Sequence, residues 1–385
     1  MKHPSFKPQH GFSLIDLMVG IVIALVAMLV VYQVFAVGEQ FKRNTTSISE
    51  AQVNGLLASF ALGLQLANSG NALATSAQDL AACDDQVAEP DLTKRFAKSW
   101  RPLPILVFDG GAPGTPDSFL VNYSTSTNLV APAPVIAAAG NTYVVQSPNG
   151  FHPISGAERK DLIVAIQNAP FGATGLCAAA RVESVVPSTT PACMAAQGCV
   201  ELTFNAAPLG GTPYSVFNMG AADDAQKIGY DIDTAKNVLR GTVLIDQQGQ
   251  PAANPVPNPL ASNIVNMKLL YGIDTDGDGL RDDWVPATGA WAPAVLLSAA
   301  TPISKLNQIK AVRIGILVQG EQFDKNLEKF TGGDYLNGDY NWTMFEGAVK
   351  VTGTMPATVS PGGNWRFRVY ETVIPLRNEI WNKQT

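Results

Sequence analysis

An acidic turn at residues 274–283 carries the residue types best suited to binding a hard cation. Three aspartates alternate along its first half, a glycine that permits a sharp turn follows, and a fourth aspartate stands two residues beyond a leucine. With the leucine carbonyl, this spacing matches ligand positions 1, 3, 5, 7 and 9 of an EF-hand-like loop, whose oxygen ligands favour Ca²⁺ over zinc. We therefore expect a structural calcium ion held by Asp274, Asp276, Asp278, the Leu280 carbonyl and Asp282.

The loop departs from a full EF-hand at its last ligand position. Val285 stands where an EF-hand has a bidentate glutamate, and no helices clearly flank the turn. Asp283 could supply the missing oxygen. The alternative interpretation is a solvated acidic turn without a cation, since aspartate and glycine form turns readily.

Histidine is too scarce for most hydrolytic chemistry. The chain has three histidines, of which His3 and His10 lie near the N-terminus and His152 lies between Phe151 and Pro153. The sequence contains no G-x-S-x-G, H-E-x-x-H or phosphate-binding loop. We therefore expect that the protein is not an enzyme.

A lone carboxylate, Asp16, stands at the start of an apolar segment that carries no charge from Leu17 to Gly38. As a helix this segment is about 33 Å long at a rise of about 1.5 Å per residue, which is enough to cross a hydrocarbon core of about 30 Å. A carboxylate at the edge of a membrane span is costly unless it is paired. Asp16 is therefore a candidate functional residue.

The residues from Gly11 to Met18, between a basic leader and the apolar segment, resemble the N-terminus of a type IV prepilin. The resemblance implies that residues 1–11 are a leader, that prepilin peptidase cuts after Gly11, and that Phe12 becomes N-methylated. It also implies that Asp16, which replaces the family's glutamate, pairs with the N-terminal amine of a neighbouring subunit during assembly. An ordinary membrane anchor, a secretory signal peptide and a buried core helix remain as alternatives.

The pattern after the span predicts an α+β fold with a long N-terminal helix over residues 12–70, of which 12–38 lie in the membrane or filament core. Val53, Leu56, Leu57, Phe60 and Leu64 fall on one face of this helix, whose second half should pack against the body. Residues 71–385 are expected to form a mostly antiparallel, β-rich globular domain outside the membrane. The expected strands are 119–123, 142–145, 162–166, 180–185, 200–204, 240–245, 264–271, 311–318 and 366–374, with an extended loop at 250–259 and a short helix near 304–310.

The chain contains four cysteines, and a body outside the inner membrane would meet conditions that favour disulfides. Four cysteines allow three pairings. We favour Cys193–Cys199, which closes a short loop, together with Cys83–Cys177. The alternative is two or more free, buried thiols.

Three further segments resemble the PilW family of minor pilins. They are the strand ending at Tyr271 with the acidic turn after it, the run at 312–318, and the closing run at 369–378. The resemblance implies a minor pilin of the tip or priming complex that initiates type IV pilus assembly; whether such pili serve twitching motility, adhesion or DNA uptake stays open. Its partners would be other minor pilins, the major pilin, a pilus-tip adhesin, prepilin peptidase and the inner-membrane assembly platform.

The resemblance further implies a single-pass inner-membrane protein with a cytoplasmic N-terminus, which moves to the periplasm and the extracellular pilus tip on assembly. Two other functions stay open: a J-like minor pseudopilin of a type II secretion system, and a tip adhesin that binds through the region 73–241, which resembles no family we can name. The formal net charge of −6 makes nucleic acid an unlikely partner.

Overall fold

The structure is a computed structural model with one long helix and a β-rich body. It describes residues 13–71, 73, 89–101, 103–128, 132–147, 149–151, 160–167, 177–190, 198–210, 213, 215–224, 226–298, 300–321, 341–345, 350–354 and 367–376.

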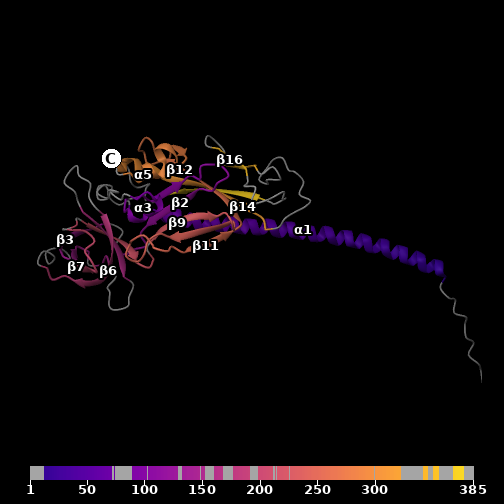
Figure 1. The fold of residues 1–385 in the computed structure, drawn as a ribbon, viewed down its shortest axis with the longest axis horizontal. Coiled ribbons are helices and arrows are strands. Elements are labelled where there is room, and N and C mark those ends of the chain that lie inside the picture. The colour runs from indigo at the N-terminus through magenta and orange to yellow at the C-terminus, as the bar shows by residue number, and fades with distance from the viewer. Residues whose placement is uncertain are drawn as a thin grey trace, which may run out of the picture.

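Helix α1 (Leu14–Asn68) is 55 residues long and begins at Ser13, whose hydroxyl accepts a hydrogen bond from the Ile15 N–H. At about 1.5 Å per residue it is about 80 Å long. Its N-terminal part projects from the body on the side away from the barrel described below (Figure 1). The first buried side chain along it is Ser47, so the helix meets the body only in its second half.

The docked face of α1 is built mainly from small residues and leucines. Ala51, Ala58, Leu62 and Leu66 are buried against strands of both main sheets, and Gly55 lies on the same face. The apolar face that the sequence periodicity singles out points away from the body, because Val53, Leu56, Leu57, Phe60 and Leu64 are all exposed. The second half of the helix does pack on the body, but through the opposite face.

A five-stranded sheet forms one layer of the body, and its strand order shows where an insertion enters. Strands β2 and β9 pair directly, although more than 100 residues separate Tyr123 from Gln226 at one end of their register. The sheet order is β1 (Ile105–Phe108), β2 (Ser118–Tyr123), β9 (Gln226–Asp233), β10 (Val238–Val243) and β11 (Pro257–Ser262).

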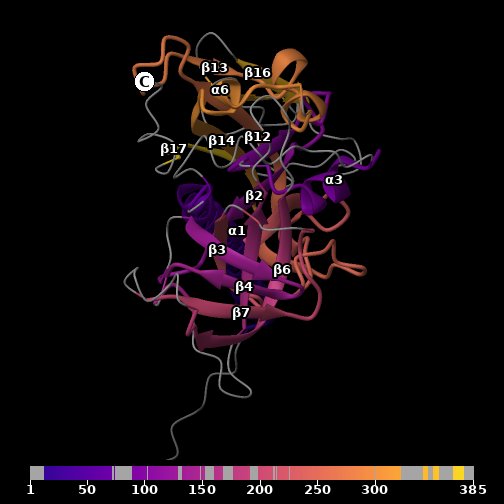
Figure 2. The same cartoon turned by 90° about the vertical axis from the view of Figure 1, so that its left-hand side faces the viewer.

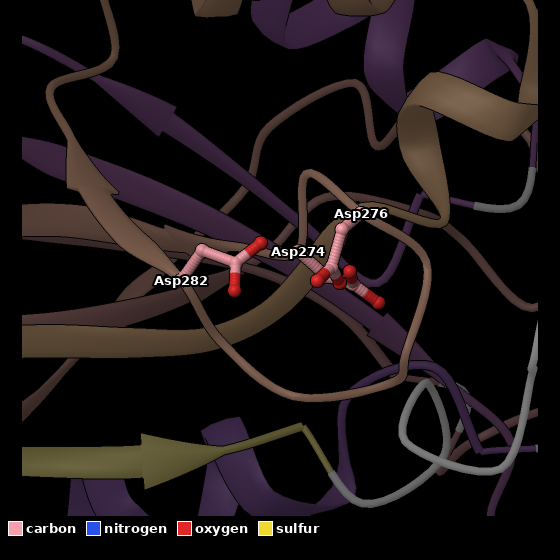
Figure 3. A group of neighbouring side chains, drawn as sticks. All are labelled: Asp274, Asp276 and Asp282. Carbon is pink, nitrogen blue, oxygen red and sulfur yellow. The ribbon is translucent and has the colours of Figure 1, made fainter.

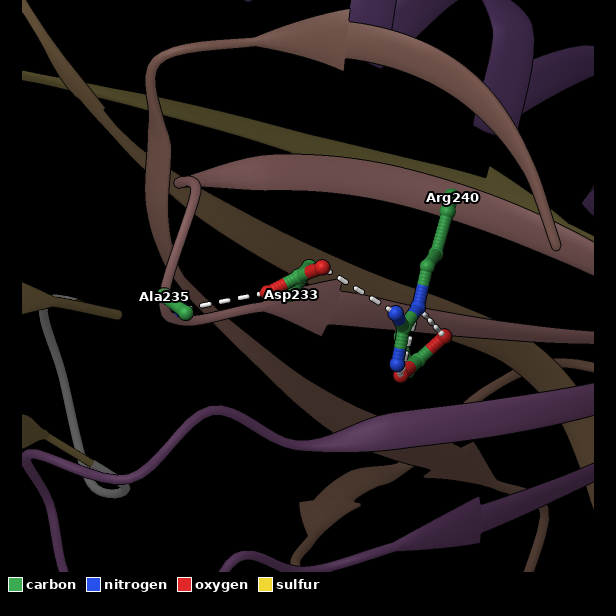
Figure 4. A network of polar contacts seen from close by, with 4 residues as sticks. Asp233, Ala235 and Arg240 are labelled. Carbon is green, nitrogen blue, oxygen red and sulfur yellow. Dashed lines mark hydrogen bonds and ion pairs between the residues drawn. The ribbon is translucent and has the colours of Figure 1, made fainter.

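The β9–β10 hairpin is fixed by an arginine facing two aspartates. Arg240 lies opposite Asp231 in the register and donates from Nε and Nη2 to its two carboxylate oxygens at 3.0 and 2.7 Å (Figure 4). Its Nη1 also donates to Asp233 at 3.3 Å, and Asp233 accepts the Ala235 N–H in the turn. These bonds raise the pKa of Arg240 and hold the register of the hairpin.

A four-stranded sheet forms the second layer, in the order β13 (Asp283–Val285), β12 (Ile264–Ile273), β14 (Ile309–Gln319) and β17 (Phe367–Pro375). Alternate residues of β12 and β14 face opposite sides, as a pleated strand requires. One side joins the core that α1 covers, and the other packs on Trp342, Met344 and Phe345 of the hairpin β15 (Asn341–Met344) and β16 (Val351–Thr354). Short helices complete the body: α3 (Leu92–Lys98), η1 (Gly289–Trp291), α5 (Pro293–Leu296) and α6 (Ile303–Leu306).

A closed six-stranded barrel is inserted between β2 and β9 and has a core of its own around Tyr143, Leu202 and Phe204. It lies at the opposite end of the body from the four-stranded sheet (Figure 2) and farthest from the N-terminus of α1. Around the barrel the order is β3 (Ala133–Ala139), β4 (Thr142–Val145), β7 (Val200–Phe204), β6 (Cys177–Pro187), β5 (Asp161–Ile166) and β8 (Ser215–Ala221).

The predicted fold class is confirmed: a long N-terminal apolar helix precedes a β-rich body, and the strand pairings in the described part of the chain are antiparallel. All nine expected strands are present with small shifts at their ends. Two local expectations hold only in part. The helix near 304–310 ends at Leu306 because β14 begins at Ile309, and the proline-rich loop contains β11 from Pro257 onward.

Candidate cation-binding loop and N-terminal anchor

The acidic loop connects two paired strands rather than two helices. It leaves β12 after Ile273 and returns as β13, whose Asp283 lies opposite Ile273 in the register. The Asp282 N–H donates to the Ile273 carbonyl at 2.8 Å, which closes the base of the loop. The Asp274 N–H donates to the Gln308 carbonyl, so the loop is also tied to the segment before β14. The carboxylates therefore stand on a rigid hairpin base.

Three carboxylates approach one another in this loop (Figure 3). One oxygen each from Asp274, Asp276 and Asp282 lies within 4.8 Å of the others. Asp274 is buried, whereas Asp276 and Asp282 are exposed. These three belong to the five ligands expected from the sequence. Asp278, whose Oδ1 accepts the Leu280 N–H at 2.6 Å, does not belong to this group.

Backbone amides already stabilise the buried member of the group. Asp274 accepts the Gly277 N–H at 2.7 Å on one oxygen and the Gly279 N–H at 2.9 Å on the other. Both glycines have positive φ, at 82° and 89°, which the tight turn requires and other residues adopt poorly. The two glycines thus wrap the chain around the Asp274 carboxylate.

Thr275 positions Asp282, a role that the spacing of the aspartates does not predict. Its N–H and its hydroxyl both donate to the same Asp282 oxygen at 2.6 Å. These bonds lower the pKa of the Asp282 carboxyl, which therefore stays ionised well below neutral pH. The signal available in the sequence was a hydroxyl residue directly after the first aspartate of the loop.

The donor set of this loop suits a hard cation. All three converging groups are carboxylates; each Asp274 oxygen accepts one amide and keeps a further lone pair, and the two Thr275 bonds occupy only one oxygen of Asp282. The group contains neither sulfur nor imidazole, so it matches calcium or magnesium better than zinc. One of the four predicted aspartates differs in role: Asp278 lies outside the group and would have to turn toward it to act as a ligand.

The N-terminal candidates lie partly outside the described residues. Gly11 and Phe12 are not described, and Asp16 lies in the exposed first turn of α1. Among the described residues, α1 is the helix long and apolar enough to cross a membrane; its most apolar 18-residue window has a mean hydropathy of 3.0, and none of it is buried. This apolar helix supports a membrane anchor.

Two of the four cysteines are described, and both are disulfide-bonded. Cys177 begins β6 and Cys199 directly precedes β7. Cys83 and Cys193 lie outside the described residues. The favoured pairing, Cys193–Cys199 with Cys83–Cys177, stays a prediction.

A cavity of about 400 Å³ opens between the β1–β2 loop, β12 and β16. Its wall contains a buried ion pair, in which Lys268 Nζ lies 2.7 Å from Asp117 Oδ1. Asp117 also accepts the Gly110 and Leu269 amides at 2.9 Å. Burial raises the pKa of Asp117 more than these contacts lower it. The pair ties the β1–β2 loop to β12, and its two charges neutralise each other. It therefore suits a structural role better than ligand binding.

Residues 230–378 match the family model of type IV pilus-assembly protein W, PilW. The matched segment begins in β9, contains the acidic loop and reaches past β17, whereas α1 and the barrel lie outside it. Over these residues the match confirms the resemblance to the PilW family expected from the sequence. Comparison with curated proteins gave no match, and comparison with solved structures gave none.

Proposed function

Because residues 230–378 carry the PilW family match, we propose that this chain is a minor pilin of a type IV pilus, a structural subunit of the tip or priming complex that initiates pilus assembly. The match by itself supports a role in type IV pilus assembly. The finer assignment depends on the whole architecture. Its main support is an apolar helix that extends well beyond the body and needs another surface to cover it.

The position of the barrel supports a subunit at the tip rather than along a shaft. The barrel is a separate bulky unit at the end of the body farthest from the membrane-facing end of α1 (Figure 1). A unit of this size at every level of a thin filament would crowd its neighbours, but a tip has free space beyond it. A few copies at the tip therefore agree with this shape.

Processing and assembly centre on the N-terminus. We propose that prepilin peptidase cuts after Gly11 and methylates Phe12, which leaves a cationic amine four residues before Asp16. No charged residue follows Asp16 until Glu39, so a neighbouring subunit's amine is a suitable partner for this carboxylate in an apolar setting. Its partners would be the other minor pilins, the major pilin, a tip adhesin, the peptidase and the inner-membrane assembly platform.

The acidic loop supports a second element of the proposal, a structural Ca²⁺. Asp274, Asp276 and Asp282 would hold the ion, and its charge would offset the repulsion among their carboxylates. The loop lies inside the family-matched segment and ties β12, β13 and the start of β14 together. A bound ion would therefore stabilise this corner of the four-stranded sheet.

Two alternatives keep specific support. A J-like pseudopilin of a type II secretion system would share the N-terminal helix. A tip adhesin would use the distal barrel, which lies outside the family match, and this role is compatible with a minor pilin.

Deletion of the gene tests the proposed function. Surface pili are counted in the deletion strain with retraction active and with retraction blocked, and secretion of type II substrates is measured in the same strains. Loss of pili that blocking retraction partly reverses, with normal secretion, supports a priming subunit. Normal piliation together with lost secretion overturns it in favour of the pseudopilin.

A further inference from the structure

The second half of α1 exposes an apolar stripe that no described part of the body covers. The stripe consists of Val53, Leu56, Leu57, Phe60 and Leu64, with exposed fractions from 48% to 66%. Their spacing of three and four residues places them on one side of the helix, opposite the docked residues Ala51, Ala58, Leu62 and Leu66. The described part of the body therefore does not obstruct approach to the stripe.

Lipid cannot cover this stripe when α1 is anchored. If the span ends near Gly38, Val53 stands about 22 Å and Leu64 about 39 Å further along an upright helix. The headgroup region adds only about 5–8 Å on each side of the hydrocarbon core. The stripe thus stands in water above the membrane, where its exposure is unfavourable unless another protein surface packs on it.

The stripe is large enough for a helix pair. Five large apolar side chains, each about half to two-thirds exposed, present about 400–500 Å² of apolar surface, which exceeds what isolated surface residues provide. Two such surfaces facing each other bury close to the 1,000 Å² or so expected of a specific interface. The spacing also follows the heptad pattern of a short coiled coil.

We propose that the stripe is a docking surface for the same stripe of a second copy of this chain, forming a parallel, in-register helix pair above the membrane. Anchoring through the same span places the stripes of two copies at the same height, and both N-termini on the same side require parallel helices. A two-fold axis along the helices then brings stripe against stripe and leaves both bodies outside.

Charge permits this pairing between identical chains. No charged residue occurs from Ala51 to Leu73, so a parallel register brings no like charges together among the five stripe residues; the nearest acidic residue, Glu50, lies one turn before Val53. A stripe adapted to a different, charged helix would be expected to have charged residues at its edges, with the sign opposite to that of the partner helix. The inference depends on membrane anchoring of α1 and is independent of the role in pilus assembly.

Cysteine cross-linking of the full chain in its native membrane tests the pair. Single variants Phe60→Cys and Leu64→Cys are treated with a short bis-maleimide, and the unsubstituted chain gives the background. Asn54→Cys and Ser59→Cys are matched controls, since these helix residues lie at the two flanks between the stripe and the docked face. We expect several-fold more homodimer from the stripe variants than from the flank variants.

A second substitution distinguishes a specific helix pair from cross-links that arise when chains collide at random in the membrane. Adding Leu57→Gln to the Leu64→Cys chain should lower its homodimer yield several-fold, while maleimide labelling of the thiol stays the same. Equal cross-linking at stripe and flank positions would overturn the proposal. So would labelled stripe thiols that give no homodimer, or that cross-link only to a different protein. Normal pilus counts in the deletion strain would overturn the proposed function without affecting this result.

Discussion

The ring of Tyr370 on β17 lies directly against the backbone of Gly55 on α1, so closely that a Cβ at position 55 would overlap ring carbons. At Gly55 the helix therefore approaches the four-stranded sheet closely. Glycine is required here for close approach rather than for a bend in the helix. The contact makes the position of α1 on the body specific, because a larger residue would push the helix away from β17.

Replacing Gly55 tests this contact. Gly55→Ala should destabilise the docked helix by about 1–3 kcal/mol, because overpacking of a tight contact outweighs the better helix propensity of alanine. Gly63→Ala is the matched control: nothing lies within 4 Å of the added Cβ, so it should be neutral or stabilise by up to about 1 kcal/mol. Urea unfolding of the full chain in detergent measures both. A stabilising Gly55→Ala would contradict the close approach.

A buried lysine on β9 holds the C-terminal end of helix α3. Lys227 Nζ donates to the carbonyl oxygens of Phe96, Ala97 and Ser99, which the helix itself leaves unbonded, and lies 3.9 Å from the centre of the Trp100 ring. Lys227→Met should cost about 1–3 kcal/mol, because buried carbonyls lose their donor. Lys236→Met, at an exposed turn position, should change stability by less than about 0.5 kcal/mol. Equal thermal shifts for the two variants would show that Lys227 does not hold the helix.

The sequence predicted individual strands and helices better than it predicted which strands pair with one another. The runs at 264–271 and 311–318 are continuous and apolar, and they became the central strands of the four-stranded sheet, buried on both faces. Closure of the barrel depends on β3 pairing with β8, far along the chain, and no local pattern specifies that pairing. The periodicity of α1 marked an apolar face, but a pattern cannot say which surface covers it.

The strand taken for a loop and the missed role of Thr275 have the same kind of cause, a dependence on the surrounding structure. Pro257 and Pro259 suggested a loop, yet β11 is an edge strand of its sheet, where the missing N–H can face away from the ladder. In the acidic loop, aspartate spacing identified three carboxylates that do converge. The role of Thr275 depends on a turn geometry that spacing alone does not specify.

A pair of carboxyl groups should make helix docking sensitive to pH. Burial raises the pKa of Glu50 on α1, and the nearby charge and hydrogen bond of Glu321 raise it further. Folding therefore disfavours the ionised form, so stability is highest below the ordinary pKa of 4.5 and falls as pH rises through the raised pKa. Glu50→Gln should remove this loss. Urea midpoints between about pH 7 and pH 5 measure it.

The control for this prediction is Glu39→Gln, a change at a helix residue that lies before the docked half of α1. It should leave the pH dependence unchanged. A Glu50→Gln chain that loses stability at neutral pH, or keeps the full pH dependence, would show that Glu50 on α1 does not interact with Glu321, which follows β14.

Calcium should stabilise the acidic loop. We expect the thermal midpoint of the full chain to rise with calcium on the order of millimolar, as for other weak extracellular sites, and Asp276→Asn to remove most of that rise. Asp246→Asn is the control, because Asp246 also accepts backbone amides in a turn but lies outside the group. An unchanged midpoint in the native chain, with no heat of binding by calorimetry, would contradict the site.

The most direct test of the central claim is mass spectrometry of the N-terminal peptide from the mature protein in its native membrane. A pilin subunit is predicted to begin with N-methyl-phenylalanine at Phe12, with residues 1–11 absent. Substitution of Gly11 should block this processing and leave the leader attached. A mature chain that retains Met1, or that begins after Gly38, would contradict the assignment as a type IV pilin.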